Sequence, residues 1–374
     1  MTAKSPTGSS LTGWEQLQLL CLLLTDSEPT SYIERINSTD SWPTLVDLAS
    51  SHQCLPALAA KLNACAHLSC APETTPASLN GLGRQVAVRT MSIYAQALRL
   101  AETLNKAEIT PIFLKGTATL LSSKAADFAA RDQADIDVVV EPANLRAACE
   151  QLVEAGYRFT TTRPNDNKGN VTTHRDIERA LKESRYHHHL PPMTHPKATA
   201  LVELHRYHLP AGFDQAGILE DLLNTAATHT AGDIRFRVPS FEHRAIHLIL
   251  GSFVHDGYAA TCRVPIRPAL DYIQLMSEAT ADDTKIDNAS VAQTCGIRGE
   301  QFFYLLKWLF EVEAPILFTE AKANALTERL IKARYNNART ATYLDTLGRV
   351  RHLGKKMLVS PGKLTGYIRN NLKG

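Results

Sequence analysis

Two aspartates separated by one residue, Asp135 and Asp137, are the residues of this sequence best suited to chemistry. They lie in the β-branched, apolar run 135–140 (DIDVVV), which is typical of a strand. Side chains alternate along a strand, so both carboxylates emerge on one face while Ile136 and Val138 take the other. Adjacent carboxylates that are partly buried repel each other, and a divalent cation such as Mg²⁺ can compensate their charge.

The pair alone is better explained by a solvated strand end, but its surroundings favour phosphate chemistry. Upstream, an apolar run ends in Lys115, Gly116 and Thr117 and leads into a helix. Gly116 allows close approach of the backbone to a ligand, and the first N–H groups of the helix can bind a phosphate. Downstream, Glu203 in the run 202–205 (VELH) can supply a third carboxylate from a neighbouring strand. Three acids and a glycine turn before a helix are the minimum set for metal-assisted phosphoryl or nucleotidyl transfer.

The elements that must position these residues alternate between strands and helices in the middle of the chain. Apolar and β-branched runs predict strands over 109–114, 135–140, 157–162, 185–190 and 199–205. Helical spacing predicts helices over 118–123, 142–156 and 175–183. The chain before and after this part is predicted to be helical, at 14–24, 43–62, 86–104, 240–252, 301–312, 320–334 and 338–347, with a loop over 70–79.

These elements predict an α+β fold, in which a mixed β-sheet core is flanked by helical regions at both ends of the chain. The expected segments are a disordered N-terminus (1–12), a helical N-terminal region (13–107), an α/β core (108–210), a helical C-terminal domain (211–345) and a basic C-terminal tail (346–374).

Composition and charge exclude several classes of protein. The 374 residues include 40 Lys and Arg against 38 Asp and Glu, a net charge of +2, which excludes a uniformly basic nucleic-acid coat and a uniformly acidic tail protein. The apolar run 19–24 is far shorter than the roughly 20 residues of a membrane-spanning helix. The cysteines number seven and lack C-x-x-C spacing, which favours reduced thiols over disulfides. We therefore expect a cytoplasmic protein without a transmembrane segment.

The same residues resemble the nucleotidyltransferase superfamily that includes DNA polymerase β and kanamycin nucleotidyltransferase. More narrowly, the chain is similar to a bacterial family of uncharacterised nucleotidyltransferases over most of 14–275. The shared segments read LKG at 114–116, Arg131, DIDVVV at 135–140, GY at 156–157 and VELH at 202–205. The chain departs from the pattern at Thr117, where the superfamily usually has Gly or Ser, and at Arg206, where the family usually has Trp.

The resemblance implies a Mg²⁺-dependent enzyme, with Mn²⁺ as an alternative, that moves a nucleoside monophosphate from a nucleoside triphosphate to an acceptor. It implies a two-metal site in which Asp135 and Asp137, with Glu203, hold two Mg²⁺ ions. Gly116 and Thr117 would then bind the triphosphate, and Lys115 or Arg131 would neutralise its charge. A purely structural alternative is that Lys115 caps the turn and that Arg131 pairs with Asp132 or Asp127. The acceptor is expected to be a small molecule, a sugar or a peptide.

Histidines form the second cluster of interest, because 14 are present and three are consecutive at 187–189. In a strand, His187 and His189 share a face, and we expect them, with His205, to contact the acceptor or the base. Zinc binding by these residues and His208 is the less favoured alternative, since no compact ligand spacing is present.

The C-terminal tail carries seven Lys or Arg and no acid over 346–374. It is either a solvated helix or an attachment to an anionic partner such as RNA, a phosphorylated acceptor or a bilayer. In the C-terminal helical domain, Arg267 is expected to pair with Asp271 at i,i+4. A toxin-like transferase acting on tRNA is an alternative function, and so is a non-catalytic nucleotide-binding module. Three uncompensated acids argue against the non-catalytic module.

Overall fold

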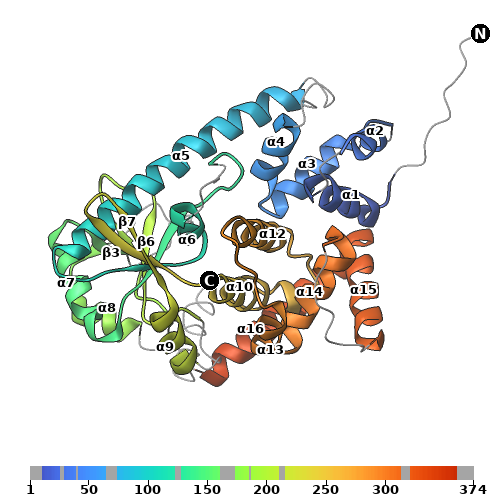
Figure 1. Cartoon of the computed structure of the whole chain (residues 1–374). Coiled ribbons are helices and arrows are strands. Elements are labelled where there is room, and N and C mark those ends of the chain that lie inside the picture. Colours follow the sequence, from blue (N-terminus) through green and yellow to red (C-terminus); the bar gives the residue numbers. More distant parts are fainter. Residues whose placement is uncertain are drawn as a thin grey trace, which may run out of the picture.

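The computed structural model describes residues 11–25, 29–38, 41–64, 74–122, 128–160, 173–184, 187–209, 215–312 and 321–359. These residues form the predicted α+β fold, with a sheet on one side of the molecule and a helical region on the other (Figure 1). The expected disordered N-terminus lies outside the described residues except for 11 and 12, and so does the tail beyond 359.

Eight described strands form one mixed sheet in the order β4-β3-β5-β6-β2-β1-β8-β7. Their bounds are β1 Ile112–Phe113, β2 Asp135–Val139, β3 Arg158–Thr160, β4 Thr173–His174, β5 Met193–Thr194, β6 Leu201–His205, β7 Ala227–Ala231 and β8 Ile234–Val238. The pairs β2–β6 and β1–β8 are parallel, and the others are antiparallel.

The strand predictions need four corrections. The two-residue strands β4 and β5 were not predicted. The strand expected over 109–114 is only two residues long, and its backbone turns at once into a helix at Lys115. The histidine run does not form a strand: within the described part of 185–190, only His189 makes an isolated bridge, to His205. The hairpin β7–β8 falls inside the segment expected to be helical, where the two-residue turn Gly232–Asp233 between alternating residues was an overlooked hairpin signal.

The long helix α5 (Thr74–Asn105) covers one face of the sheet. Its apolar stripe, represented by Ile93, Ala97 and Leu100, is buried in a core shared with β2, β6 and helix α7 (Leu145–Glu154). The helix starts earlier than expected, so the loop prediction over 70–79 was wrong from residue 74 onward. Pro76 is compatible with this start because it lies in the first turn, where a missing N–H removes no intrahelical bond.

The remaining helices of the described residues are α1 Gly13–Thr25, α2 Thr30–Ser38, α3 Trp42–Ser51, α4 Leu55–Ala64, α6 Lys115–Ser122, α8 Ile177–Glu183, α9 Gln215–Thr225, α10 Phe241–His247, α11 Tyr258–Thr261, α12 Ile266–Ala281, α13 Asn288–Cys295, α14 Ile297–Phe310, α15 Ala321–Asn336 and α16 Ala338–Val359. A π-helical segment, Leu248–His255, continues α10.

The helices from the two ends of the chain share one hydrophobic core. Buried side chains of α1–α4 pack with those of α10 and α12–α15. The rings of Trp14 in α1 and Trp308 in α14 stack with centroids 4.9 Å apart. The N-terminal and C-terminal helical regions therefore form a single layer beside the sheet, and α5 leaves that layer to pack on the sheet.

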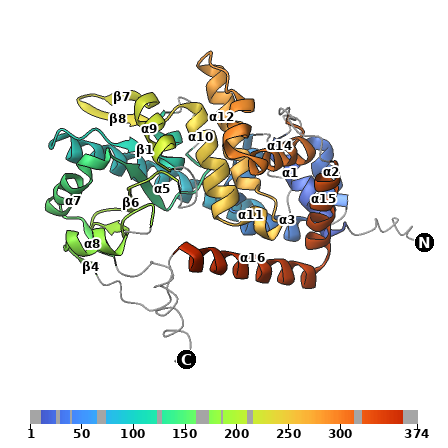
Figure 2. The ribbon, with the colours of Figure 1, turned by 90° about the horizontal axis from the view of Figure 1, so that it is seen from below.

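Helix α16 runs along the outside of the helical layer and contacts α11 and α15 (Figure 2). It continues from the predicted helix at 338–347 to Val359, so the first half of the predicted basic tail is helical. On its outer face Tyr343, Leu347 and Val350 are exposed. Among the described residues, no helix combines the length and the apolar character needed to span a membrane.

Candidate active site

The acids predicted from the sequence converge because β2 and β6 are parallel neighbours. In the register of this pair, Asp137 lies opposite Glu203, and Asp135 lies opposite Leu201. Alternation places the three acids on the face opposite α5, because the apolar residues between them are buried in the core under that helix. A carboxylate oxygen of Asp137, one of Glu203 and a ring nitrogen of His205 all lie within 4.8 Å of one another.

Asp137 is the buried centre of this group, with 2% of its surface exposed. Its Oδ1 accepts a hydrogen bond from Nζ of Lys115 at 2.6 Å and another from Nε2 of His205 at 2.8 Å. Burial alone would raise the pKa of Asp137. The Lys115 ammonium and the hydrogen bond from His205 outweigh burial and hold this pKa well below its usual range. Asp137 is therefore ionised and held in one orientation.

The donor set fits a divalent cation. Burial raises the pKa of Asp135 to about 6, and the charge of Asp137 acts in the same direction. Glu203 adds to this repulsion, so the three carboxylates carry more negative charge than Lys115 alone can balance. Oxygen ligands suit Mg²⁺, and the imidazole of His205 is an additional donor of the kind that Mn²⁺ and other transition metals accept.

Lys115 has an unusual backbone conformation at the first residue of α6. Its φ is +49°, a left-handed value that is uncommon for residues other than glycine. Such a conformation persists where surrounding contacts hold it, and here the side chain is fixed on Asp137. The carboxylates of Asp137 and Glu203 raise the pKa of Lys115 although burial acts in the opposite direction. The lysine is thus a charged member of the site and does more than cap the turn.

The turn after Lys115 is braced by Gln133, a residue that the sequence analysis did not single out. Thr117 is fully buried, and its hydroxyl accepts a hydrogen bond from Nε2 of Gln133 at 2.6 Å. The same nitrogen lies 2.7 Å from the backbone oxygen of Asp135. Gln133 thus links the turn to β2. The Thr117 hydroxyl is buried and held by Gln133, so the backbone N–H groups of Gly116 and Thr117 are the donors of this turn best suited to bind a phosphate.

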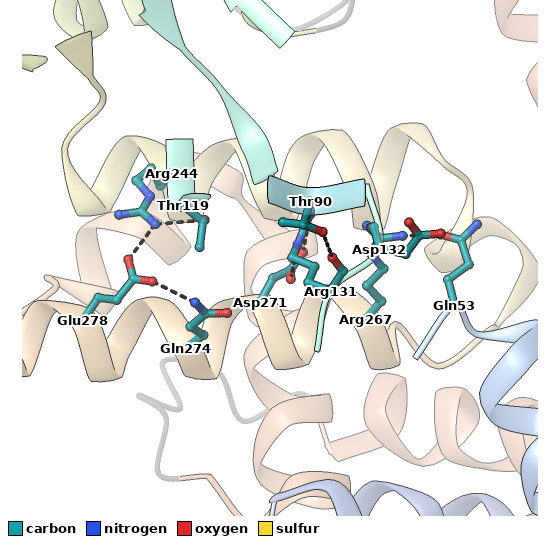
Figure 3. A network of polar contacts seen from close by, with 10 residues as sticks. All are labelled: Gln53, Thr90, Thr119, Arg131, Asp132, Arg244, Arg267, Asp271, Gln274 and Glu278. Atoms are coloured by element: carbon teal, nitrogen blue, oxygen red, sulfur yellow. Dashed lines mark hydrogen bonds and ion pairs between the residues drawn. The ribbon is translucent and has the colours of Figure 1, made fainter. Parts of the chain in front are cut away.

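Arg131 lies against this turn and pairs with a residue of α12 (Figure 3). Its Nε and Nη2 donate to the two carboxylate oxygens of Asp271 at 2.8 and 3.0 Å. The alternative that Arg131 pairs with Asp132 was wrong, and Asp127 lies outside the described residues. The expected Arg267–Asp271 ion pair was also wrong, because Asp271 bonds to Arg131. In both cases the predicted partner was a near neighbour in the sequence, and the bond is instead made between Arg131 and Asp271, which are distant in the sequence.

Arg267 instead joins three parts of the chain. Its Nη2 donates to the backbone oxygen of Asp132 at 2.6 Å, and its Nη1 donates to Oε1 of Gln53 at 2.8 Å. The residue therefore connects α12 to the segment before β2 and to the loop between α3 and α4, as Figure 3 shows.

Two of the three predicted histidines reach the acids. His205 contacts Asp137, and Nε2 of His189 lies 3.9 Å from Oε2 of Glu203. His187 lies further out, with its ring centroid 6.3 Å from that of His189. Within the described ranges, the group with three converging metal donors is the one made by Asp137, Glu203 and His205, so the histidine run itself forms no such group.

The sequence analysis assigned no role in the site to His188 or His255. The ring of His188 lies between those of His189, His205 and His255, with centroids 4.7, 5.3 and 5.5 Å away. Burial lowers the pKa of His188 to about 2, so its ring is neutral. His255 ends the π-helical segment, and π-helices are common at functional sites. The helical layer thus reaches the site at this point.

Most of the chain matches a known protein family. The family described as "Uncharacterised nucleotidyltransferase" matches residues 38–310, which is more than half of the chain and includes every acid of the site. No curated protein matches the chain.

Proposed function

The chain belongs to the uncharacterised nucleotidyltransferase family, and on that premise we propose that it transfers a nucleoside monophosphate from a nucleoside triphosphate to an acceptor, with Mg²⁺ or Mn²⁺ as cofactor. The observation that carries this proposal is the register of β2 and β6, which sets Asp137 opposite Glu203 and brings their oxygens within 4.8 Å. A cluster of acids on a sheet face is costly without a cation, and the donor set suits one.

In this reaction Asp135, Asp137 and Glu203 would hold the metal. When bound, the metal would stabilise the triphosphate charge and activate the acceptor hydroxyl. The backbone N–H groups of Gly116 and Thr117 at the start of α6 would bind the β- and γ-phosphates. These roles are the ones that the geometry of the turn supports best.

Two cations stand beside this turn. Lys115, held on Asp137 by its ammonium group, would shift to the phosphate charge that builds up during transfer. Arg131 uses Nε and Nη2 for Asp271, and its Nη1 faces Gly116. We therefore assign Arg131 to the nucleotide site mainly as a support of the turn.

The bond changes are those of a direct displacement at phosphorus. An acceptor oxygen would attack the α-phosphorus, and the bond to pyrophosphate would break. If the acceptor is a hydroxyl, its proton would pass to a carboxylate, for which Glu203 is the best placed. His189, 3.9 Å from Glu203, and His205 would lie near the acceptor, as would His187 at greater distance.

Labelled nucleotides test this proposal. The full chain is incubated with each α-labelled nucleoside triphosphate, Mg²⁺ or Mn²⁺ and a cell extract, and the labelled product is identified. Label on a sugar, small molecule or peptide is the expected result, and label on tRNA would support the toxin-like alternative.

The control is the double variant Asp135→Asn, Asp137→Asn, which should fold and transfer nothing. If wild type and variant behave alike with every nucleotide and both metals, the catalytic proposal is wrong. Nucleotide binding without transfer would then favour the non-catalytic module.

The basic C-terminal segment is a second, separate part of the proposal. Arg349 and Arg351 are exposed on α16 and precede five further basic residues in the sequence. We expect this segment to attach to an anionic partner, with affinity that falls as salt rises. Replacing both arginines by Gln should reduce retention on a polyanion column at low salt. Unchanged retention across the salt range would remove this part of the proposal.

A further inference from the structure

We propose that Asp271 and Glu278 of α12 are positioning residues, which hold the nucleotide-binding turn of α6 in place through two arginines. This inference rests on the proposed function, because that function assigns the turn to the triphosphate. Neither residue bonds to the candidate metal-binding acids, but Arg131 acts on the pKa of Asp135 through its charge. We therefore expect the larger effect on the turn and a smaller one on the acids.

The first link runs from Asp271 through Arg131 to Gly116. The bidentate bond between Arg131 and Asp271 fixes the plane of the guanidinium group. That plane lies directly against Gly116: a Cβ atom added there would be 2.0 Å from Nη1 of Arg131 and 2.6 Å from its Cζ. The arginine therefore fills the space of a side chain at position 116. The position of Gly116 therefore depends on where Asp271 holds the guanidinium group of Arg131.

The second link runs from Glu278 through Arg244 to Thr119. Nη2 of Arg244 donates to Oε2 of Glu278 at 2.8 Å and to Oγ1 of Thr119 at 3.0 Å. The side chains of Arg244 and Glu278 are only 8% and 13% exposed, so water competes little for this bond. Gln274 adds a bond to Oε1 of Glu278 at 3.0 Å.

The two links act together because Asp271 and Glu278 lie on the same helix. Asp271 and Glu278 are seven residues apart, which is two turns, so they lie on the same face of α12. Their partner arginines both contact α6: Arg131 lies against Gly116, and Arg244 bonds to Thr119. Figure 3 shows the bonds from Asp271 to Arg131 and from Glu278 through Arg244 to Thr119. One rigid helix of the helical layer therefore sets the position of the turn relative to the sheet.

The test uses two separate variants of the full chain, Asp271→Asn and Glu278→Gln. Three measurements are made on each variant and on wild type. The first is hydrogen exchange of the backbone amides in 112–122. The second is Mn²⁺ affinity, measured without nucleotide. The third is the affinity for each of the four nucleoside triphosphates in the presence of Mg²⁺. Loss of a charged hydrogen bond should speed exchange in 112–122 by about tenfold and weaken nucleotide binding by about the same factor. Mn²⁺ affinity should change much less than nucleotide affinity.

Two further variants separate positioning from general stability. Asp345→Asn removes a comparable ion pair, with Arg334 at 2.9 Å between α15 and α16, and should leave 112–122 unchanged. Asp271→Glu keeps the charge and should restore part of the protection lost in Asp271→Asn. If Asp271→Asn does not fold, Glu278→Gln tests the same claim through Thr119.

Equal exchange of 112–122 in wild type, Asp271→Asn and Glu278→Gln would overturn the inference. So would an equal change in Asp345→Asn, since the effect would then be one of stability. If wild type binds none of the nucleotides, the proposed function fails, but the exchange measurement still decides whether α12 positions the turn.

Discussion

Nζ of Lys115 lies 2.6 Å from Oδ1 of Asp137, so the acid at the centre of the candidate metal site already forms an ion pair with a lysine of the same chain. The contact joins the first residue of α6 to the middle of β2. A metal ion bound by the acids would lie close to the ammonium group of Lys115, and the two positive charges would repel each other. The lysine must therefore weaken metal binding, or move when a metal or a phosphate arrives.

Replacing Lys115 by Gln should tighten Mn²⁺ binding in the absence of nucleotide. Removing a like charge near the cation is worth about 1 kcal/mol at high effective dielectric, or about fivefold in affinity. The same variant should bind nucleoside triphosphates more weakly, because it lacks the cation for the phosphates. Mn²⁺ binding by electron paramagnetic resonance checks the first effect, with Lys307→Gln, an exposed lysine of α14, as the matched control. Weaker Mn²⁺ binding in Lys115→Gln would show that the lysine organises the acids instead.

Gly116→Ala should destabilise the protein by about 1–3 kcal/mol, because the new methyl group would be 2.0 Å from Nη1 of Arg131. The displaced arginine would also strain its bond to Asp271. Gly81→Ala is the control: no atom lies within 4 Å of a Cβ at that position in α5, so helix propensity should leave the free energy of unfolding unchanged or raise it by up to about 1 kcal/mol. Urea unfolding measures both. Similar values for the two variants would mean that the turn adjusts freely.

Metal affinity should fall as the pH drops through about 6. Burial and the charge of Asp137 raise the pKa of Asp135 to about 6, so below that pH a proton competes with the metal for this carboxylate. Mn²⁺ affinity is expected to change little from pH 8 to 7 and to fall by up to about tenfold per unit below 6. In Asp135→Asn the affinity should be lower throughout and should lose this pH dependence. A wild-type affinity that stays constant down to pH 5 would contradict the assignment of Asp135.

The stability of the fold should decline in mild acid because of buried histidines. Burial lowers the pKa of His208 to about 3 from an ordinary value of 6.5. Among the described residues neither of its ring nitrogens has a hydrogen-bond partner. Between these pH values the unfolded chain binds a proton that the folded chain does not. The stabilisation from keeping this ring neutral is therefore complete above pH 6.5 and is lost as the pH falls.

Each such histidine contributes a slope of up to about 1.4 kcal/mol per pH unit below 6.5. His52 and His188 should act in the same direction, because burial lowers their pKa values to about 3 and about 2. Urea unfolding of wild type and His208→Leu at pH 7.5, 6 and 5 measures the slope, which should be smaller in the variant. Equal slopes would show that His208 is protonated in the folded protein.

Local sequence rules were sufficient for the parts of the site that depend on one element. The alternation of a strand put Asp135 and Asp137 on one face, and the same rule turned Glu203 away from its apolar neighbours. The spacing of apolar residues over 86–104 predicted a helix there, and the apolar face of α5 packs on the sheet. Local rules failed for the histidine run, which was predicted to be a strand but pairs with another strand only through the bridge of His189.

The sequence by itself determined which residue types stand on which face of each strand and helix, because that depends only on the period of the element. The tertiary structure alone decided which of these faces meet. It set Asp137 opposite Glu203 by pairing β2 with β6 in parallel, and it gave Arg131 a partner 140 residues away in Asp271. The reason is that strand register and helix docking minimise the free energy of the whole core, so a charge takes the partner that packing brings to it, whatever the distance along the chain.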